Sequence, residues 1–190
     1  MIELLLASQS PRRRELLSSL GYPLQFVDID VDETIDRPIE ASMVAEYLAQ
    51  RKASAFDAST LSSNQVLVTA DTVVVHKNEV LGKPHNIEQA KQMLRSLSND
   101  QHYVYTGVCL TTHSLQHHFT EATTVWFDPL NEKEIDYYVT HHSVLDKAGA
   151  YGIQDWIGMV GIPRIDGCFY NVMGLPVARI WKELKKIVDC

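Results

Sequence analysis

The segment at residues 66–75 constrains the fold of this chain more than any other. It reads VLVTADTVVV, an almost continuous apolar run that is typical of a central strand covered on both faces. Other strand patterns and several amphipathic helix patterns lie before and after it in the chain. We therefore expect a mixed α/β fold with a twisted central sheet that is flanked by helices.

Apolar periodicity places the other elements. A first strand at residues 4–7 precedes a helix that begins at Pro11. Further strands are expected at residues 24–27, 103–112 and 122–127. Further helices are expected at residues 41–58, 87–97 and 131–140, and in a last segment that ends near Val188.

A hairpin is expected directly after the central strand. Lys77 and Asn78 fit a two-residue loop, after which the chain returns antiparallel. With this loop length Thr72 faces Lys83 across the hairpin. The same register brings Lys83 beside Asp71.

The composition bounds the class of protein. A chain of 190 residues with 45% hydrophobic residues can bury a substantial core and fits one domain over residues 1–190. The net charge of −7 argues against broad binding to DNA or RNA, whereas a local basic site suits a small polyanion. The cysteines are odd in number and lack a CxxC pair, so neither a disulfide framework nor a zinc site is expected from Cys109, Cys168 and Cys190.

Cysteine usage of this kind favours a reducing cytoplasm. The first residues lack a basic leader region, and no apolar run approaches the roughly 18 residues that span a membrane. We expect a soluble, cytoplasmic protein without a membrane partner.

Three arginines follow the expected start of the first helix, where positive charge is unfavourable. Ser10 is the expected N-cap and Pro11 the first helical residue. Each cation in this turn should cost roughly 0.3–1 kcal/mol beside the positive end of the helix dipole. A phosphate would remove the conflict, and the helical wheel turns Arg13 and Arg12 toward it while Arg14 points away. The alternative is a solvated basic helix start.

Two further charged residues interrupt apolar patterns. Lys52 lies on the apolar face of the helix expected at 41–58, and Asp71 interrupts the central strand. A carboxylate there needs an ion pair, hydrogen bonds, a metal ion or a place at the open end of the sheet. Both can also be structural, because a lysine stem can cover apolar surface and an aspartate can lock a turn or bridge a lysine.

Gln154 and a group of histidines are the remaining candidates. Gln154 ends a stretch of small residues, and its amide can pair with a base edge; it can also lie exposed without a role. The histidines have loop-like neighbours and no accompanying carboxylate spacing, which indicates surface residues and not metal ligands at His113, His117, His118, His141 and His142.

Several short segments form one ordered set. They are S-x-S-P-R-R at residues 8–13, Asp32-Glu33, Lys52, A-D-T at 70–72, G-K-P at 82–84, T-G-V at 106–108 and D-K-A-G-x-Y-G-I-Q at 146–154. Together they resemble the Maf family of nucleotide pyrophosphatases along nearly the whole chain. The chain departs from the family's glycine-rich continuation at Asp155 and Trp156, and has Cys168 where serine is frequent.

The resemblance implies a Maf/ITPase-like fold with two lobes around a cleft, and a homodimer. It also implies hydrolysis of a nucleoside triphosphate to the monophosphate and pyrophosphate, with Mg²⁺ or Mn²⁺, as a house-cleaning step of the nucleotide pool. Arg12, Thr72 and Gln154 match the branch of the family that takes dTTP, UTP and modified pyrimidine analogues.

The resemblance also implies roles for single residues. Asp71 would accept a proton from water or position the water through the metal, and Glu33 would help Asp71 to hold the metal. Substrate would be bound by Ser8, Arg12, Arg13, Lys52, Thr72, Lys83 and Gln154.

Two other functions stay open. One is a house-cleaning pyrophosphatase for purines such as ITP and XTP. The other is a non-catalytic, nucleotide-binding regulator of cell division. Glu33 and Asp71 argue against the second, because a protein that only binds triphosphate gains little from extra carboxylates unless metal is involved.

Overall fold

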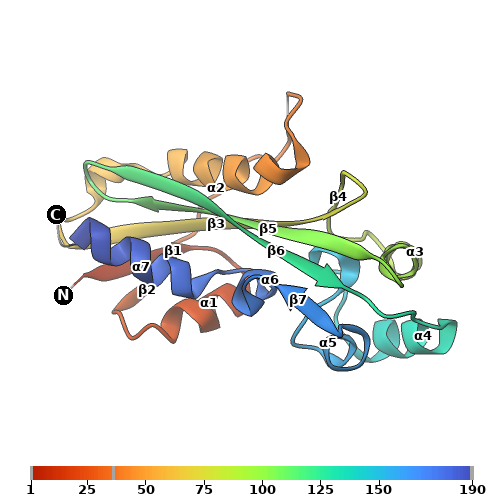
Figure 1. Cartoon of the computed structure of the whole chain (residues 1–190). Coiled ribbons are helices and arrows are strands. Elements are labelled where there is room, and N and C mark those ends of the chain that lie inside the picture. The colour runs from red at the N-terminus through yellow and green to blue at the C-terminus, as the bar shows by residue number, and fades with distance from the viewer. Residues whose placement is uncertain (1, 36, 189–190) are drawn as a thin grey trace. The chain divides into compact units, whose positions relative to one another are not determined.

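The computed structural model describes residues 2–35 and 37–188 (Figure 1). Cys190 lies outside these described residues. Among them, seven strands form one mixed sheet in the order β2-β1-β3-β5-β6-β7, with β4 paired to β3. The chain divides into two compact units. Unit 1 takes the described parts of 1–71, 106–121 and 174–190, and unit 2 takes 72–105 and 122–173.

Unit 1 is built on parallel strands. β1 (Glu3–Ala7) pairs in parallel with β2 (Leu24–Phe26) and β3 (Gln65–His76). Parallel neighbours need a crossover connection, which α1 (Pro11–Ser18) supplies between β1 and β2. Figure 1 shows α2 (Val44–Ser54) on one face of these strands, and α1 and α7 (Val177–Val188) on the other.

The central strand of unit 1 is buried as its sequence predicts. In β3, Val66, Leu67 and Val68 are at most 2% exposed. A strand that is covered by helices on both faces requires apolar side chains in both directions. The apolar run at residues 66–75 is therefore confirmed as a covered strand.

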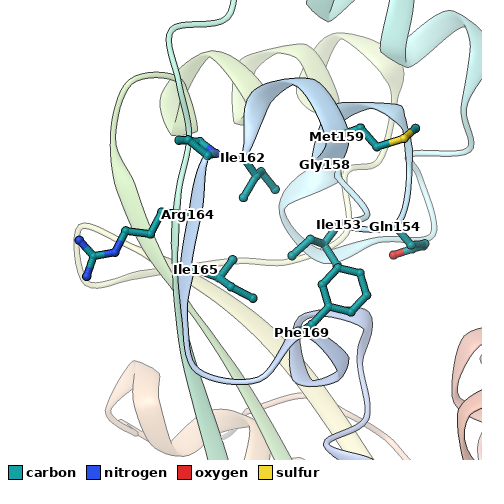
Figure 2. A pocket seen from close by; sticks show the side chains of 9 residues that line it. Ile153, Gln154, Gly158, Met159, Ile162, Arg164, Ile165 and Phe169 are labelled. Atoms are coloured by element: carbon teal, nitrogen blue, oxygen red, sulfur yellow. The ribbon is translucent and has the colours of Figure 1, made fainter.

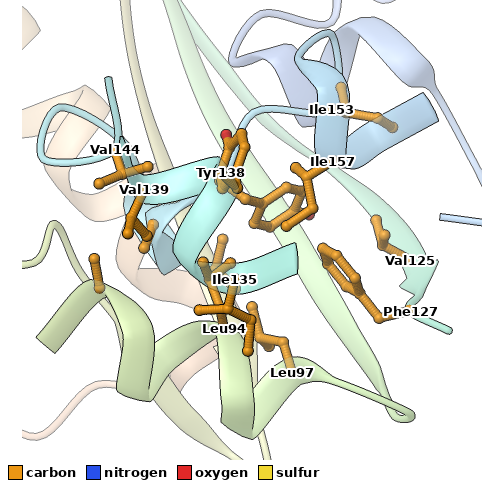
Figure 3. Close-up of a cluster of buried hydrophobic side chains, with 14 of the residues drawn as sticks. Leu94, Leu97, Val125, Phe127, Ile135, Tyr138, Val139, Val144, Ile153 and Ile157 are labelled. Carbon is orange, nitrogen blue, oxygen red and sulfur yellow. The ribbon is translucent and has the colours of Figure 1, made fainter. Parts of the chain in front are cut away.

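Unit 2 packs helices around the cluster of buried side chains in Figure 3. Leu94 and Leu97 of α3 (Ile87–Leu97) belong to this cluster, together with Ile135 and Tyr138 of α4 (Glu132–His141). The remaining elements of the unit are β4 (Glu79–Leu81), the 3-10 turn Ala148–Ala150, α5 (Trp156–Gly161), β7 (Arg164–Asp166) and α6 (Phe169–Met173). None of the helices in the described residues is both long enough and apolar enough to cross a membrane.

The hairpin between β3 and β4 has the predicted loop. Lys77 and Asn78 both have positive φ, at 49° and 67°, as the two central residues of a type I′ hairpin turn require. The paired residues run from His76 opposite Glu79 to Val74 opposite Leu81. β4 ends there, two residues before Lys83, so the predicted pairing of Thr72 with Lys83 lies beyond the observed ladder.

One predicted helix is too long. Residues 41–58 form a 3-10 turn at Ala41–Met43 and then α2, which ends at Ser54. Asp57 accounts for this early end, because its carboxylate accepts the N–H of Ser59 at 3.0 Å and starts a separate 3-10 turn. Such local bonds compete with helix continuation.

One predicted strand is too short. β6 runs over Gln116–Trp126, six residues earlier than expected, and β5 covers Gln101–Thr111. His117 and His118 therefore lie on a strand and not in a loop. Their rings contact carboxylates of unit 1. Nε2 of His117 lies 3.1 Å from Oε2 of Glu183, and Nδ1 of His118 lies 2.9 Å from Oε1 of Glu46. Polar residues that are paired in this way interrupt the alternation of apolar and polar side chains by which a strand is recognised in a sequence.

Candidate functional site

The start of α1 has the predicted cap. The Ser10 side chain accepts the N–H of Arg13 at 3.5 Å, and Pro11 is the first helical residue. The Ser8 hydroxyl accepts the N–H of Ser10 at 3.2 Å, which orders the residues before the helix. Arg12 is half-buried in this turn. Backbone N–H groups and arginines thus gather at one helix end, as anion binding requires.

Arg13 is held by two backbone carbonyls. Its Nε donates to the carbonyl of Gly174 at 2.9 Å, and its Nη1 donates to the carbonyl of Ala70 at 2.9 Å. Burial lowers the pKa of Arg13, while the charge of Asp71 opposes this shift. Arg13 therefore fixes the backbone directly before Asp71, in addition to the phosphate contact predicted for it.

Arg14 lies away from these groups. Its Nε donates to the carbonyl of Ser8 at 3.0 Å, and its guanidinium stacks over the ring of Phe26 at 4.7 Å. Arg14 thus has partners other than the groups that Arg13 contacts, in line with the helical wheel, which turns it away from the expected phosphate. It anchors the turn that precedes the helix.

Lys52 joins two of the predicted carboxylates. Its Nζ lies 2.6 Å from Oδ1 of Asp71 and 2.8 Å from Oε1 of Glu33. The side chains of Lys52 and Asp71 are each only 14% exposed, whereas that of Glu33 is 56% exposed. The structure therefore brings together three residues that the sequence indicated separately.

Thr69 explains why α2 and β3 meet at this point. Its hydroxyl donates to the carbonyl of Ala49 at 2.7 Å, one turn before Lys52 on the helix. Residues two apart on a strand share a face, so Asp71 points to the same side as Thr69. A buried hydrogen bond thus fixes the helix that carries the lysine to the strand that carries the aspartate.

The carboxylates fit the divalent cation that the Maf resemblance implies. Glu33 and Asp71 come from separate segments and converge on one ammonium group, and their summed negative charge exceeds its positive charge. Mg²⁺ is usually held by one or two carboxylates together with phosphate oxygens and water. The described residues contain no group of three or more His, Cys, Asp or Glu side chains that would hold a metal by protein ligands alone.

The other predicted substrate residues belong to unit 2. Thr72 is half-buried and follows Asp71 directly on β3, and Lys83 is exposed after β4. The carbonyl of Gly82 accepts the N–H of Gly149 at 3.1 Å, which ties the G-K-P segment to the 3-10 turn before Gln154. Two motifs that are distant in the sequence are thus linked through their backbones.

Gln154 lies at the edge of an apolar pocket of about 450 Å³ (Figure 2). Ile153, Ile165 and Phe169 line the pocket in Figure 2, and Met159 and Ile162 complete its apolar part. The Oε1 atom of Gln154 is buried and has no hydrogen-bond partner among the described residues. An amide oxygen in that position requires a donor, and a ligand can supply one.

Some residues around this pocket were missed by the sequence reasoning. Tyr138 and Lys147 lie against the backbone that carries Gln154, and Asp155 follows it. Two of them had a sequence signal, since Lys147 belongs to the motif at residues 146–154 and Asp155 departs from the family pattern. Tyr138 gave none, because its contacts reach 14 and 17 residues along the chain.

The comparisons with known proteins agree with the motif order. Residues 3–187 match the family model described as "Maf-like protein". A protein of Bacteroides thetaiotaomicron named dTTP/UTP pyrophosphatase is 48% identical over 97% of this chain and 96% of its own. A protein of Phocaeicola vulgatus with the same name is 46% identical, also over 97% of this chain and 96% of its own. The chain therefore belongs to the Maf family.

Proposed function

We propose that this chain hydrolyses dTTP, UTP and modified pyrimidine analogues to the nucleoside monophosphate and pyrophosphate, and so removes unwanted nucleotides from the pool. The observation that carries this proposal is the contact of Lys52 with both Glu33 and Asp71, in the unit that also contains the basic start of α1. The relatives named dTTP/UTP pyrophosphatase support the choice of substrate.

Charge on the phosphoryl oxygens is the main obstacle to this reaction. Arg12, Arg13 and Ser8 bind phosphate at the helix start, and Lys83 contributes a further positive charge. Lys52 has three N–H bonds, of which two point to carboxylates, so the third can reach a phosphate oxygen. Bound by Glu33 and Asp71, Mg²⁺ or Mn²⁺ would neutralise part of the phosphate charge.

Asp71 accepts the proton of the attacking water in this proposal. Lys52 donates a hydrogen bond to Oδ1 of Asp71 at 2.6 Å, which fixes the direction of the carboxylate. The link from Arg13 to the carbonyl of Ala70 holds the backbone that carries it. Asp71 thus has both the charge and the fixed position that a general base requires.

Gln154 and its pocket select the base in this proposal. The unpartnered Oε1 accepts the N3–H of thymine or uracil, and the apolar lining receives the ring with or without the 5-methyl group. Cytosine has no hydrogen on N3, so the same oxygen would face an acceptor. Sites that bind by hydrogen bonds discriminate well, because the wrong ligand leaves buried polar atoms unpaired.

The test is release of pyrophosphate from dTTP, UTP, CTP, ITP and 7-methyl-GTP, with Mg²⁺ or Mn²⁺. We expect dTTP and UTP to be preferred. Turnover of ITP far above both would favour the purine pyrophosphatase. Tight, metal-dependent binding without any product would favour the non-catalytic regulator.

Asp71→Asn tests the catalytic assignment. The variant keeps the size of the side chain and loses its charge, so we expect turnover to fall at least about 100-fold. Asp136→Asn is the matched control, because Asp136 also pairs with a lysine, Lys91, but is 56% exposed. Near-normal turnover by Asp71→Asn would remove Asp71 from the mechanism.

We further propose that the enzyme acts in the cytoplasm as a homodimer, on the cysteine usage and the family resemblance. Light scattering on the purified chain tests the second point, because a dimer has twice the mass of 21.5 kDa.

A further inference from the structure

Gln154 is the third residue of a tight turn. The turn covers residues 152–155 and is closed by a backbone hydrogen bond from the N–H of Asp155 to the carbonyl of Gly152, at 3.0 Å. The side chain of Gln154 therefore points where this turn directs it. Any rotation of the turn moves the amide of Gln154 at the edge of the pocket.

One hydroxyl group holds both ends of this turn. The hydroxyl of Tyr138 accepts the N–H of Gly152 at 3.0 Å and donates to Oδ2 of Asp155 at 2.7 Å. Tyr138 itself is fixed, because it is fully buried in the cluster of Figure 3. Burial and the bond to Asp155 raise the pKa of Tyr138, so the hydroxyl keeps its proton. The hydroxyl can therefore act as donor and acceptor at the same time.

Lys147 closes the turn from the other side. Its side chain is only 7% exposed, and its Nζ lies 3.6 Å from Oδ2 of Asp155 and 3.2 Å from Oδ1 of Asp146. It also donates to the carbonyl of Ser143. The Asp155 carboxylate, which replaces a glycine-rich continuation in the family pattern, therefore meets both a hydroxyl and an ammonium group.

The turn is also tightly packed. A Cβ atom added at Gly152 would lie 2.7 Å from the Asp155 carboxylate, 2.8 Å from Nε2 of Gln154 and 2.9 Å from Cε of Lys147. A side chain at Gly152 would therefore have to displace the ends of these three side chains. The absence of a side chain at Gly152 thus lets the side chains of Asp155, Gln154 and Lys147 gather over the turn.

We propose that Tyr138 is a positioning residue for Gln154, whose hydroxyl fixes the turn at residues 152–155 and so sets the choice of base without touching the substrate. The inference rests on the proposed role of Gln154 in base selection. An amide presents an acceptor on one side and two donors on the other. A small rotation of the turn would therefore present the base with the amide donors in place of the amide acceptor. The phosphate-binding residues of unit 1 would not change.

Tyr138→Phe is the first test, because it removes only the hydroxyl and keeps the ring in the core. We expect kcat/KM for UTP to fall about tenfold, which is the loss of one to two hydrogen bonds, through a higher KM. kcat/KM for CTP should change little, so the UTP to CTP ratio narrows about tenfold. If Tyr138 had only a structural role, kcat/KM for UTP and kcat/KM for CTP would fall together and their ratio would stay unchanged. That result would overturn the proposal.

Tyr137→Phe is the matched control. Tyr137 is the preceding residue and is 44% exposed, and its ring stacks on His141 and contacts Trp156 without needing the hydroxyl. We expect the UTP to CTP ratio of this variant to equal that of the unchanged protein. The midpoint of thermal unfolding of each variant shows whether the assay temperature lies below its transition.

A double-mutant cycle with Gln154→Ala separates the two proposals. If Tyr138 acts through Gln154, then Gln154→Ala alone narrows the ratio and adding Tyr138→Phe changes it no further. If Gln154→Ala narrows the ratio but Tyr138→Phe does not, only the positioning role fails. If Gln154→Ala leaves the ratio unchanged while pyrophosphate is still released, base selection by Gln154 fails and the positioning role fails with it.

Asp155→Ala keeps the inference testable if Tyr138→Phe does not fold. It removes the acceptor of the Tyr138 hydroxyl and leaves the bond from Gly152 in place. We expect the ratio of kcat/KM for UTP to that for CTP to narrow less than in Tyr138→Phe, by about threefold, since one of the two bonds remains. An unchanged ratio in a folded Asp155→Ala variant would contradict the proposal.

Discussion

Arg13 shows how one side chain can have two uses. A guanidinium has five N–H donors, and the contacts to the carbonyls of Ala70 and Gly174 use Nε and Nη1. Phosphate binding is the second use that we propose for the same side chain. Arg13 therefore supports the backbone before Asp71 and is also a candidate phosphate ligand.

Arg13→Ala should weaken folding as well as activity. It leaves two partly buried carbonyls without their donors, so we expect the free energy of unfolding to fall by about 2 kcal/mol. Urea unfolding measures this loss, and Arg95→Ala is the control, because Arg95 pairs with Glu88 and Glu132 at the surface. Surface pairs contribute at most about 1 kcal/mol. Equal stability of the two variants would contradict a structural role for Arg13.

Arg13→Lys separates the two uses. Lysine keeps the positive charge but lacks the planar fork that reaches two carbonyls. If backbone support matters, pyrophosphate release by Arg13→Lys should fall nearly as far as in Arg13→Ala. Retained activity would instead assign Arg13 to charge alone.

At the scale of elements, the T-G-V motif has a packing role. Gly107 on β5 lies against α2, where an added Cβ would come within 2.3 Å of backbone atoms of Glu46. No real Cβ contact is that short, so the strand and the helix would have to separate. α2 carries Lys52, and the glycine thus permits the close approach of the helix to the sheet.

Gly107→Ala should therefore destabilise the protein by about 3 kcal/mol, because backbone atoms cannot move aside as a flexible side chain can. Gly82→Ala is the matched control, since an added Cβ there meets nothing within 4 Å and its φ is not positive. That variant should stay within about 0.5 kcal/mol. Similar unfolding curves for both variants would show that β5 and α2 tolerate a wider separation.

β5 also carries a histidine that gives stability a pH dependence. His102 is fully buried, its Nε2 lies 2.7 Å from the Tyr151 hydroxyl, and its Nδ1 has no partner among the described residues. Burial, followed by the charge of His76, lowers the pKa of His102 to about 3. The folded protein therefore keeps this ring neutral at pH values where the unfolded chain protonates it.

The sign of this effect follows from proton uptake. Between pH 6.5 and 3 the unfolded state binds more protons, so this contribution is fully present above pH 6.5 and decreases toward acid. We expect a loss of about 2 kcal/mol between pH 7 and pH 5 in urea unfolding. Asp100 contributes little between pH 7 and pH 5, because its pKa is lowered to about 2 in the folded protein. Its proton uptake therefore changes stability only near and below the ordinary pKa of an aspartate. His102→Gln should lack this loss, and an equal loss in that variant would assign it to other groups.

At the scale of the molecule, much of the fold followed from local patterns. The buried strand at residues 66–75, the helix at 87–97 and the Lys77-Asn78 loop were predicted from periodicity and turn chemistry alone. The start of β6 was not, because its polar residues are paired with acidic side chains from distant elements. The residues next to β6 in the sequence do not indicate these distant partners.

The candidate site divides in the same way. Lys52 and Asp71 could be recognised because each places a charge in an apolar pattern, and the structure brings them together at 2.6 Å. The resemblance to the Maf family added the other residues in their order. Tyr138 could not be recognised, since a buried tyrosine on an amphipathic helix is ordinary until its hydroxyl partners are known.

The division of the chain has a consequence for how this protein can change. Unit 2 consists of two internal segments, residues 72–105 and 122–173, and the strands β3, β5 and β6 each continue from one unit into the other. A genetic exchange that replaced this unit would need four junctions, three of them inside hydrogen-bonded strands. A single crossover would leave one unit assembled from mismatched parts. Changes in base preference should therefore arise by point substitution around the Gln154 turn, and not by recombination of whole units.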